Sequence, residues 1–282
     1  MMSTPLTTAN GAAIAKLGFG TGRIGDKSNL DAYGERVAHA LKLGYRHIDT
    51  AWKYQTEKAV GEGIRASGVP REDIFLTTKV SHEYLRADDF ARMVDESLAN
   101  LKLDYVDMLM IHWPSPEKVP FDETMRALGK AKRDGKAKHV GVANCNIALI
   151  EDAIRLCPEP IINVQVEYHP YLDQTKLLAA VRRLGFAMTA YCPLGRGKVL
   201  SDPVVADIAR AKGKSAAQVV LRWHMQQPNV IAIPRSTNPA RQAENLNIFD
   251  FTLSDDEMAR IHALARADGR IANPPGRAPD WD

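Results

Sequence analysis

Short apolar stretches rich in Val, Ile and Leu recur along the chain, and a segment with helical periodicity follows each of them. Eight such stretches predict strands at residues 15–20, 46–51, 74–80, 106–112, 139–144, 162–168, 187–192 and 230–235. The segments between them repeat apolar residues every three to four positions, which is typical of amphipathic helices. One predicted helix face consists of Ile147, Ile150, Ile154 and Cys157.

Eight strand–helix repeats with no long linker predict an α/β fold in which one domain, residues 1–282, forms a (β/α)8 TIM barrel. The chain length fits, because such barrels typically need about 250 residues. Two helices, at about 202–212 and 215–226, are expected before the last strand, and another at 258–265 after it.

Turn-forming residues mark both ends of the chain. The pair Asn10-Gly11 favours a two-residue turn, so we expect an N-terminal β-hairpin that plugs the bottom of the barrel. Residues 269–282 are rich in Pro and Gly, and we expect them to form a C-terminal loop over one face of the barrel.

A doubly wound sheet is the alternative architecture, because residues 20–25, "GTGRIG", match the dinucleotide-binding pattern G-x-G-x-x-G. That motif needs a strand before it and a helix that starts inside it. Here the polar sequence "DKSN" follows, helical periodicity begins only near Leu30, and no acid stands at the expected distance. We therefore reject this interpretation and expect these glycines to let a loop approach another group closely.

Composition narrows the class of protein. Hydrophobic residues make up 45% of the chain, charged residues 25%, and the formal net charge is +3, which gives no case for nucleic-acid binding. The sequence shows no signal peptide and no apolar run of membrane-spanning length, so we expect a cytoplasmic protein without a membrane partner. No exposed apolar helix stands out, which favours a monomer. The thiols of Cys145, Cys157 and Cys192 lack metal-ligand spacing and are interpreted as reduced core cysteines, with no metal site.

Polar residues stand where several predicted strands end, and in a barrel of this class the chemistry lies at the C-terminal ends of the strands. Asp49 and Tyr54 follow the second strand, Lys79 lies in the third, and His112 ends the fourth. Taken singly, each has a structural explanation, such as an ion pair, a neutral core histidine or a packing tyrosine. Because the strands are neighbours, we expect all four side chains to converge.

Such a cluster can deliver a proton. A free tyrosine has a pKa near 10 and is a weak acid at neutral pH. An ammonium group beside it favours the phenolate, so we expect Lys79, held by Asp49, to lower the pKa of Tyr54. His112 can orient the substrate oxygen. With no nucleophile and no metal set, the cluster suits carbonyl reduction by a cofactor hydride.

A candidate phosphate site follows the eighth strand, in residues 233–245, "IPRSTNPARQAEN". Thr237 or Asn238 can cap a helix that has Pro239 at its first position. Helix N-termini bind anions, and the guanidinium groups of Arg235 and Arg241 suit phosphate.

The hydroxyl of Ser236 adds to that site, which favours NADPH, although a solvated arginine pair is an equally good explanation of the motif alone. Tyr191 can stack on the nicotinamide ring. Asn144 and Gln165 are suited to hold its carboxamide.

Over nearly its whole length the chain resembles the aldo-keto reductase family, through "GYRHIDTAWKY", "TTKV", "LMIHWP", "VGVANC", "VQVEYHPY", "YCPLGRG" and "IPRSTNPARQAEN". The resemblance implies a (β/α)8 barrel and a catalytic tetrad, which consists of Asp49, Tyr54, Lys79 and His112, with Tyr54 as general acid. It implies that NADPH is bound by Gly20, Thr21, Gly22, Asn144, Gln165, Tyr191, Leu194, Arg235, Ser236, Arg241, Glu244 and Asn245.

Within the family, the ending "APDWD" and the short loop "HWPSPEKVP" resemble the bacterial 2,5-diketo-D-gluconate and methylglyoxal reductases. The resemblance implies that Trp52 and Trp113 line a small substrate pocket. Three positions depart from the family pattern. Ala143 stands where Ser is usual, Thr56 where Asn is usual, and Arg235 where Lys is frequent, which leaves the balance between NADPH and NADH open.

Three other functions are weighed. A glycosidase could use Asp49 and Glu167, but a lysine paired with Asp49 would prevent it from acting as a general acid. A Schiff-base aldolase could use Lys79, although Asp49 would raise the lysine pKa. A non-catalytic NADPH-binding regulatory subunit is the third, and the intact tetrad counts against it.

Overall fold

Eight parallel strands form one sheet that closes into a barrel, in a computed structural model that describes residues 4–22, 31–115 and 117–282. The strands are β3 (Phe19–Gly20), β4 (His47–Asp49), β5 (Phe75–Val80), β6 (Val106–Ile111), β7 (Ala137–Ala143), β8 (Ile161–Glu167), β9 (Ala187–Tyr191) and β10 (Val230–Ala232). Each pairs with its neighbour in sequence order, from β3 to β10. Leu17 forms a parallel bridge to Ala232, which joins the two edges, so the predicted barrel is confirmed and the doubly wound sheet is excluded.

Three of the predicted strands are markedly shorter than expected, and the run 46–51 is reduced to His47–Asp49. The apolar run 15–20 is divided, because Ala15 ends an N-terminal hairpin and only Phe19–Gly20 belongs to the barrel sheet. The run 230–235 leaves regular pairing after Ala232, two residues before Pro234, which has no backbone N–H to donate.

The N-terminal hairpin closes the bottom of the barrel, which is the end where the strands begin. It consists of β1 (Leu6–Ala9) and β2 (Ala12–Ala15), and the turn residues Asn10 and Gly11 have φ values of 44° and 86°. Positive φ at both positions is what a tight hairpin turn requires. The buried hairpin residues pack on barrel residues, which include Met108 and Ile162, so the predicted plug is confirmed.

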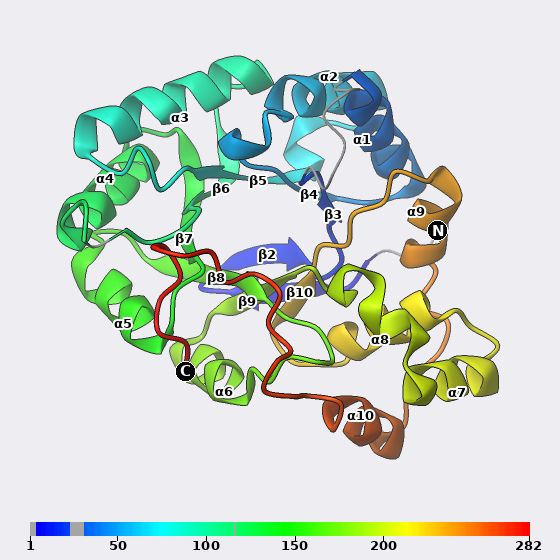
Figure 1. The fold of residues 1–282 in the computed structure, drawn as a ribbon. Helices are drawn as coiled ribbons and strands as arrows, with labels where there is room; N and C mark the ends of the chain where they lie inside the picture. The colour runs from blue at the N-terminus through cyan, green and yellow to red at the C-terminus, as the bar shows by residue number, and fades with distance from the viewer. Residues whose placement is uncertain (1–3, 23–30, 116) are drawn as a thin grey trace.

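Ten α-helices of the described chain surround the strands (Figure 1). They are α1 (Asp31–Leu43), α2 (Glu57–Ser67), α3 (Ala87–Leu101), α4 (Phe121–Arg133), α5 (Ile147–Leu156), α6 (Thr175–Leu184), α7 (Pro203–Lys212), α8 (Ala216–Met225), α9 (Pro239–Leu246) and α10 (Asp255–His262). The two helices expected before the last strand are confirmed as α7 and α8. The helix expected at 258–265 begins earlier, because Ser254 and Glu257 form a capping box.

One predicted helix face is partly wrong. Ile150 of α5 is buried, whereas Ile154 is 39% exposed and Ala153 takes its place in the core. The helical period is therefore confirmed. The centre of the buried face is shifted by about one residue from the position that the four apolar side chains predicted.

The C-terminal segment 269–282 contains no helix or strand and crosses the barrel, as predicted (Figure 1). The backbone N–H groups of Ile271 and Ala272 donate to the carboxylate of Glu167 at 2.7 and 2.6 Å. Glu167 is the last residue of β8, so the segment is held at the C-terminal end of the strands.

Residues 4–22, 31–115 and 117–282 contain no membrane-spanning helix and no metal-binding cluster. There, each helix is too short or too polar to span a bilayer, and His, Cys, Asp and Glu side chains form no cluster that could hold a metal ion. Cys145 and Cys157 are buried, whereas Cys192 is partly exposed, so the prediction of core thiols is wrong for Cys192.

Candidate active site

A buried ion pair lies at the C-terminal end of the barrel strands. Lys79 of β5 donates from Nζ to Oδ1 of Asp49 on β4 at 2.6 Å, and it donates to the carbonyl of Thr50 at 2.9 Å. Gln165 donates to the second carboxylate oxygen of Asp49 at 2.7 Å. Both charged groups are almost completely shielded from solvent, so each depends on the other for compensation.

Tyr54 and His112 complete the cluster that the sequence predicted. Tyr54 ends a short 3-10 helix (Trp52–Tyr54) that follows β4, and its ring centroid is 5.4 Å from Nζ of Lys79. The rings of Tyr54 and His112 meet edge to face, with centroids 5.4 Å apart. The structure therefore brings all four residues of the tetrad to one place.

The direction of the Tyr54 pKa differs from the expected one. Burial raises this pKa well above 10, and the negative charge of Asp49 acts in the same direction. The expected net lowering of this pKa was wrong, because burial, and then the negative charge of Asp49, outweigh the attraction of the Lys79 ammonium for the phenolate. Tyr54 therefore keeps its proton at neutral pH, which is the form that a proton donor needs.

The other two titrating groups are also controlled by burial. Burial, followed by the positive charge of Lys79, lowers the pKa of His112 well below its usual value, so the imidazole is neutral. Burial lowers the pKa of Lys79, and the pairing with Asp49 opposes this shift without reversing it. Asp49 thus raises the lysine pKa as expected, but burial outweighs it, so the net shift does not exclude an aldolase. Lys79 is fully enclosed, however, which leaves a substrate carbonyl no access to its amine.

Three further predicted residues form a hydrogen-bond network beside the tetrad. Tyr191 donates from its hydroxyl to Oδ1 of Asn144 at 2.7 Å, and Asn144 donates from Nδ2 to the carbonyl of His112 at 2.8 Å. The backbone N–H of Asn144 donates to the carbonyl of Gln165. Asn144 has a φ of 58°, a conformation that Asn tolerates better than most residues.

The departures at positions 143 and 56 have different consequences. Ala143 is fully buried at the end of β7 and supplies no hydroxyl group. Thr56 is buried too, and its hydroxyl lies 3.2 Å from that of Thr50 and 3.4 Å from that of Thr21. Thr56 therefore ties the loop after β4 to the loop after β3, a contact that the sequence did not reveal.

Gly20, which ends the first barrel strand, and Gly22, in the loop after it, have different surroundings. A Cβ atom on Gly20 would lie 2.9 Å from the carbonyl oxygen of Ile233, so packing between barrel strands requires this glycine. A Cβ atom on Gly22 would lie 3.6 Å from the Tyr54 ring, which places Gly22 beside the tetrad. Residues 23–25 of the "GTGRIG" motif lie outside the described residues.

The predicted phosphate site has its helix cap at Asn238. The Asn238 side chain accepts from the backbone N–H groups of Ala240 and Arg241, so the first amides of α9 are already occupied. Ser236 exchanges hydrogen bonds with the backbone of the same Asn238. An anion at this site would therefore be bound mainly by side chains. The Nε–H of Arg235 is buried and has no hydrogen-bond partner.

The remaining predicted cofactor residues lie on two elements. Glu244 and Asn245 are in the last turn of α9, and Asn245 is buried. Leu194 immediately precedes a 3-10 segment (Gly195–Ser201) after β9. Their relation to a bound nucleotide stays a prediction.

Tryptophan residues lie around the tetrad. Trp52 donates from its indole N–H to Glu96 at 2.8 Å. Trp113 packs edge to face on Trp281 of the C-terminal segment, with ring centroids 6.4 Å apart, and Arg270 lies 3.7 Å from the centroid of the Trp281 ring. The sequence did not indicate Arg270 or Trp281 as site residues, because only the folded chain brings this segment back to the barrel.

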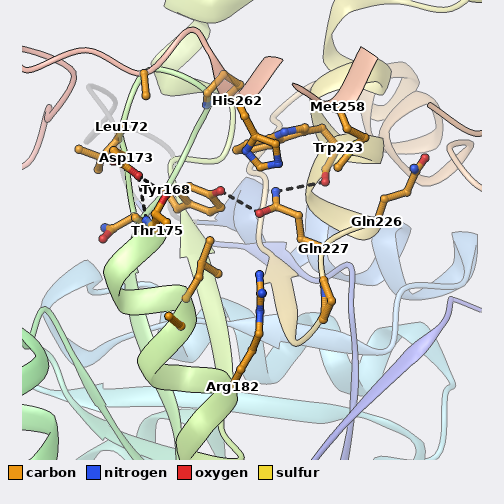
Figure 2. Close-up of a pocket in the computed structure, with 16 residues that line it drawn as sticks. Tyr168, Leu172, Asp173, Thr175, Arg182, Trp223, Gln226, Gln227, Met258 and His262 are labelled. Atoms are coloured by element: carbon orange, nitrogen blue, oxygen red, sulfur yellow. Dashed lines mark hydrogen bonds between the residues drawn. The ribbon is translucent and has the colours of Figure 1, made fainter. Parts of the chain in front are cut away.

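A cavity of the described chain lies away from the tetrad. It measures about 530 Å³ and lies between α6, α8 and α10, where Figure 2 shows Tyr168, Trp223 and His262 among the lining residues. Tyr168 and Gln227 in its wall are already bonded to each other at 2.8 Å. No residue of the tetrad lines this cavity, so the chemistry of the side chains, and not the cavity volume, locates the candidate active site.

Known proteins resemble this chain in sequence and in structure. The model of the Aldo/keto reductase family matches residues 16–266. Methylglyoxal reductase DkgB of Escherichia coli O157:H7 is 40% identical over 272 residues, which cover 96% of this chain and 100% of that protein.

Two solved structures extend the comparison. The crystal structure of a proposed 2,5-diketo-D-gluconic acid reductase B superposes with a TM-score of 0.95 at 47% identity, over 99% of this chain and 98% of the other. The Bombyx mori aldo-keto reductase AKR2E4, solved in complex with NADP, gives a TM-score of 0.87 at 34% identity and covers 94% of each chain.

Proposed function

Because this chain belongs to the aldo-keto reductase family, we propose that it reduces small aldehydes and ketones to alcohols with NADPH. Suitable substrates are α-dicarbonyls such as methylglyoxal and diketo-sugar acids such as 2,5-diketo-D-gluconate. These are the compounds for which two similar proteins are named.

In this proposal Tyr54 is the general acid. NADPH, when bound, supplies the hydride. The neutral His112 orients the carbonyl oxygen by a hydrogen bond, and the Tyr54 hydroxyl gives its proton to that oxygen as it becomes an alkoxide. Lys79 then lies beside the phenolate that remains, and its positive charge stabilises the negative charge of the phenolate.

The observation that carries the proposal is the enclosed Lys79–Asp49 pair behind a protonated phenol. Before proton transfer the Lys79–Asp49 pair has no net charge, and the Tyr54 phenol keeps its proton. After transfer, the ammonium group lies 5.4 Å from the centroid of a negatively charged ring. Its attraction for the phenolate lowers the barrier, because the cation is already in position.

The residues present fit a dinucleotide phosphate. The buried, unpartnered Nε of Arg235 needs an anionic acceptor, and we propose that Arg235, Ser236, Arg241, Glu244 and Asn245 hold the adenosine phosphate end. Asn144, Gln165 and Tyr191 would hold the nicotinamide, with Gly20, Thr21, Gly22 and Leu194 along the cofactor. Trp52 and Trp113 would line the substrate pocket.

Turnover by the wild-type protein tests this function. NADPH oxidation is measured with methylglyoxal and with 2,5-diketo-D-gluconate, and borohydride is added in a parallel reaction. Oxidation of NADPH with either carbonyl supports the proposal. Covalent trapping of substrate on Lys79 would instead support a Schiff-base aldolase, and NADPH binding without turnover of any carbonyl would support a regulatory subunit.

We also propose that the chain acts as a single-domain cytoplasmic monomer. Leu6 and Ile154 are the large hydrophobic residues exposed in the described ranges, and they lie on different elements, so no extended apolar face supports an oligomer. Sedimentation equilibrium should give the mass of one chain, 31.1 kDa.

A further inference from the structure

Arg235 is held from one side by a residue of α1. It donates from one terminal nitrogen to the hydroxyl of Tyr33 at 2.9 Å, and its Cζ lies 5.9 Å from the centroid of the Tyr33 ring. Tyr33 is only 3% exposed, so its ring is fixed by the surrounding core. A fixed hydroxyl limits the directions in which the Arg235 guanidinium can point.

A second guanidinium lies over the same ring. Arg36 is one turn further along α1, and its Cζ is 4.8 Å from the Tyr33 centroid. Among the described residues, one nitrogen of Arg36 and Nε of Arg235 are buried without a hydrogen-bond partner. Buried cationic donors without acceptors are unfavourable, and two like charges around one ring repel each other, so the arrangement is suited to an anion.

We propose that Tyr33 and Arg36 complete the site for the 2′-phosphate of NADPH and so make the enzyme selective for NADPH over NADH. Tyr33 is a positioning residue for Arg235, and Arg36 is a second cation for the phosphate. Neither belongs to the stretch 233–245 that carries the predicted phosphate motif. The inference rests on the proposed function, because it assumes that the chain binds a nicotinamide dinucleotide.

The chemistry of the two cofactors explains the selectivity. A phosphate monoester carries a charge of about −1.5 to −2 at neutral pH and three acceptor oxygens. NADH has a hydroxyl group in its place, which would leave the donors of Arg36 and Arg235 largely unpaired. A site whose charged side chains need an ionic group discriminates against a ligand that lacks this group, because the charged side chains are then left unpaired.

Binding of NADP⁺ and NAD⁺ by calorimetry tests the inference. Tyr33→Phe removes the hydroxyl that holds Arg235 and keeps the ring, and Arg36→Gln removes one cation. Each should raise the Kd for NADP⁺ by about 10- to 100-fold and leave the Kd for NAD⁺ within about twofold, because only the phosphate contact is lost. Arg36→Lys, which keeps the charge, should recover part of the NADP⁺ affinity.

Lys42→Gln is the matched control. Lys42 is an exposed cation in the last turn of the same helix, so its loss changes the net charge equally but should not change selectivity. Equal weakening of both nucleotides by the Tyr33 and Arg36 variants, or no weakening of either, would contradict the inference. Equal binding of both nucleotides by the wild type would also overturn it, whereas binding of neither would overturn the proposed function and this inference with it.

Discussion

At the scale of single residues, Lys79 and Asp49 make each other's burial possible. Their 2.6 Å contact is the one ion pair in the described chain in which both side chains are almost fully enclosed and neither is a histidine. Removing one partner of such a pair leaves an uncompensated buried charge, which costs about 3–5 kcal/mol, whereas removing both often costs little.

A double-mutant cycle tests this dependence. Asp49→Asn and Lys79→Met should each lower the free energy of unfolding by about 3 kcal/mol, and the double variant by clearly less than the sum. Urea denaturation with circular dichroism gives all three values. Strict additivity would mean that the two charges do not depend on each other.

His224 predicts a pH dependence of stability. Burial lowers its pKa to about 3, and its Nε2 lies 3.1 Å from the carbonyl of Pro193. Below a pH of about 6.5 the unfolded chain binds a proton that the folded chain does not, so stability falls as the pH falls.

Between pH 6.5 and pH 5 this loss is about 2 kcal/mol for one such histidine. His224→Gln should therefore show a shallower decline in unfolding free energy over this range than the wild type, whatever its stability at pH 7. Parallel pH profiles of the two proteins would show that His224 binds its proton equally in the folded and the unfolded chain, which would contradict the lowered pKa.

At the scale of elements, periodicity located every barrel strand in the correct order, because a buried strand needs a continuous apolar run. It was less accurate at the ends. Phe19–Gly20 is far shorter than its apolar run, and Ile154 is exposed, because tertiary neighbours decide which part of an apolar pattern is covered. The hairpin at Asn10-Gly11 was predictable in detail, since its backbone demands those residue types.

Glu167 should keep the C-terminal segment closed over the barrel. Its buried carboxylate accepts from Ile271, Ala272 and His169 at 2.6 to 2.7 Å. Glu167→Gln replaces one acceptor oxygen by an N–H donor, which cannot accept from these N–H groups. The C-terminal segment should then detach from the barrel more often, so trypsin should cleave faster after Arg277.

Mass spectrometry of the released C-terminal peptide measures that rate. Glu151→Gln is the matched control, because Glu151 pairs with Arg183 on the exposed surface. Equal cleavage rates for the Glu167 variant, the control and the wild type would show that the carboxylate does not hold the segment.

At the scale of the whole molecule, barrel topology explains why the candidate site could be predicted. Side chains at the C-terminal ends of barrel strands converge regardless of how the helices are arranged. The convergence of the four tetrad side chains could therefore be predicted from the order of the strands. Contacts between distant segments were not predictable, and Tyr33 with Arg235 and Trp113 with Trp281 are examples. The direction of the Tyr54 pKa was missed for a related reason, because local sequence reveals a neighbouring charge but not the depth of burial.

The role of Tyr54 as proton donor is the central claim, and single-turnover NADPH oxidation with methylglyoxal tests it most directly. Tyr54→Phe should slow the step by about 100- to 10,000-fold, because general acid catalysis typically contributes that much. Tyr84→Phe, a change at a tyrosine that packs on Trp52 outside the tetrad, should react at nearly the wild-type rate. Undiminished NADPH oxidation by the Tyr54 variant would contradict the account.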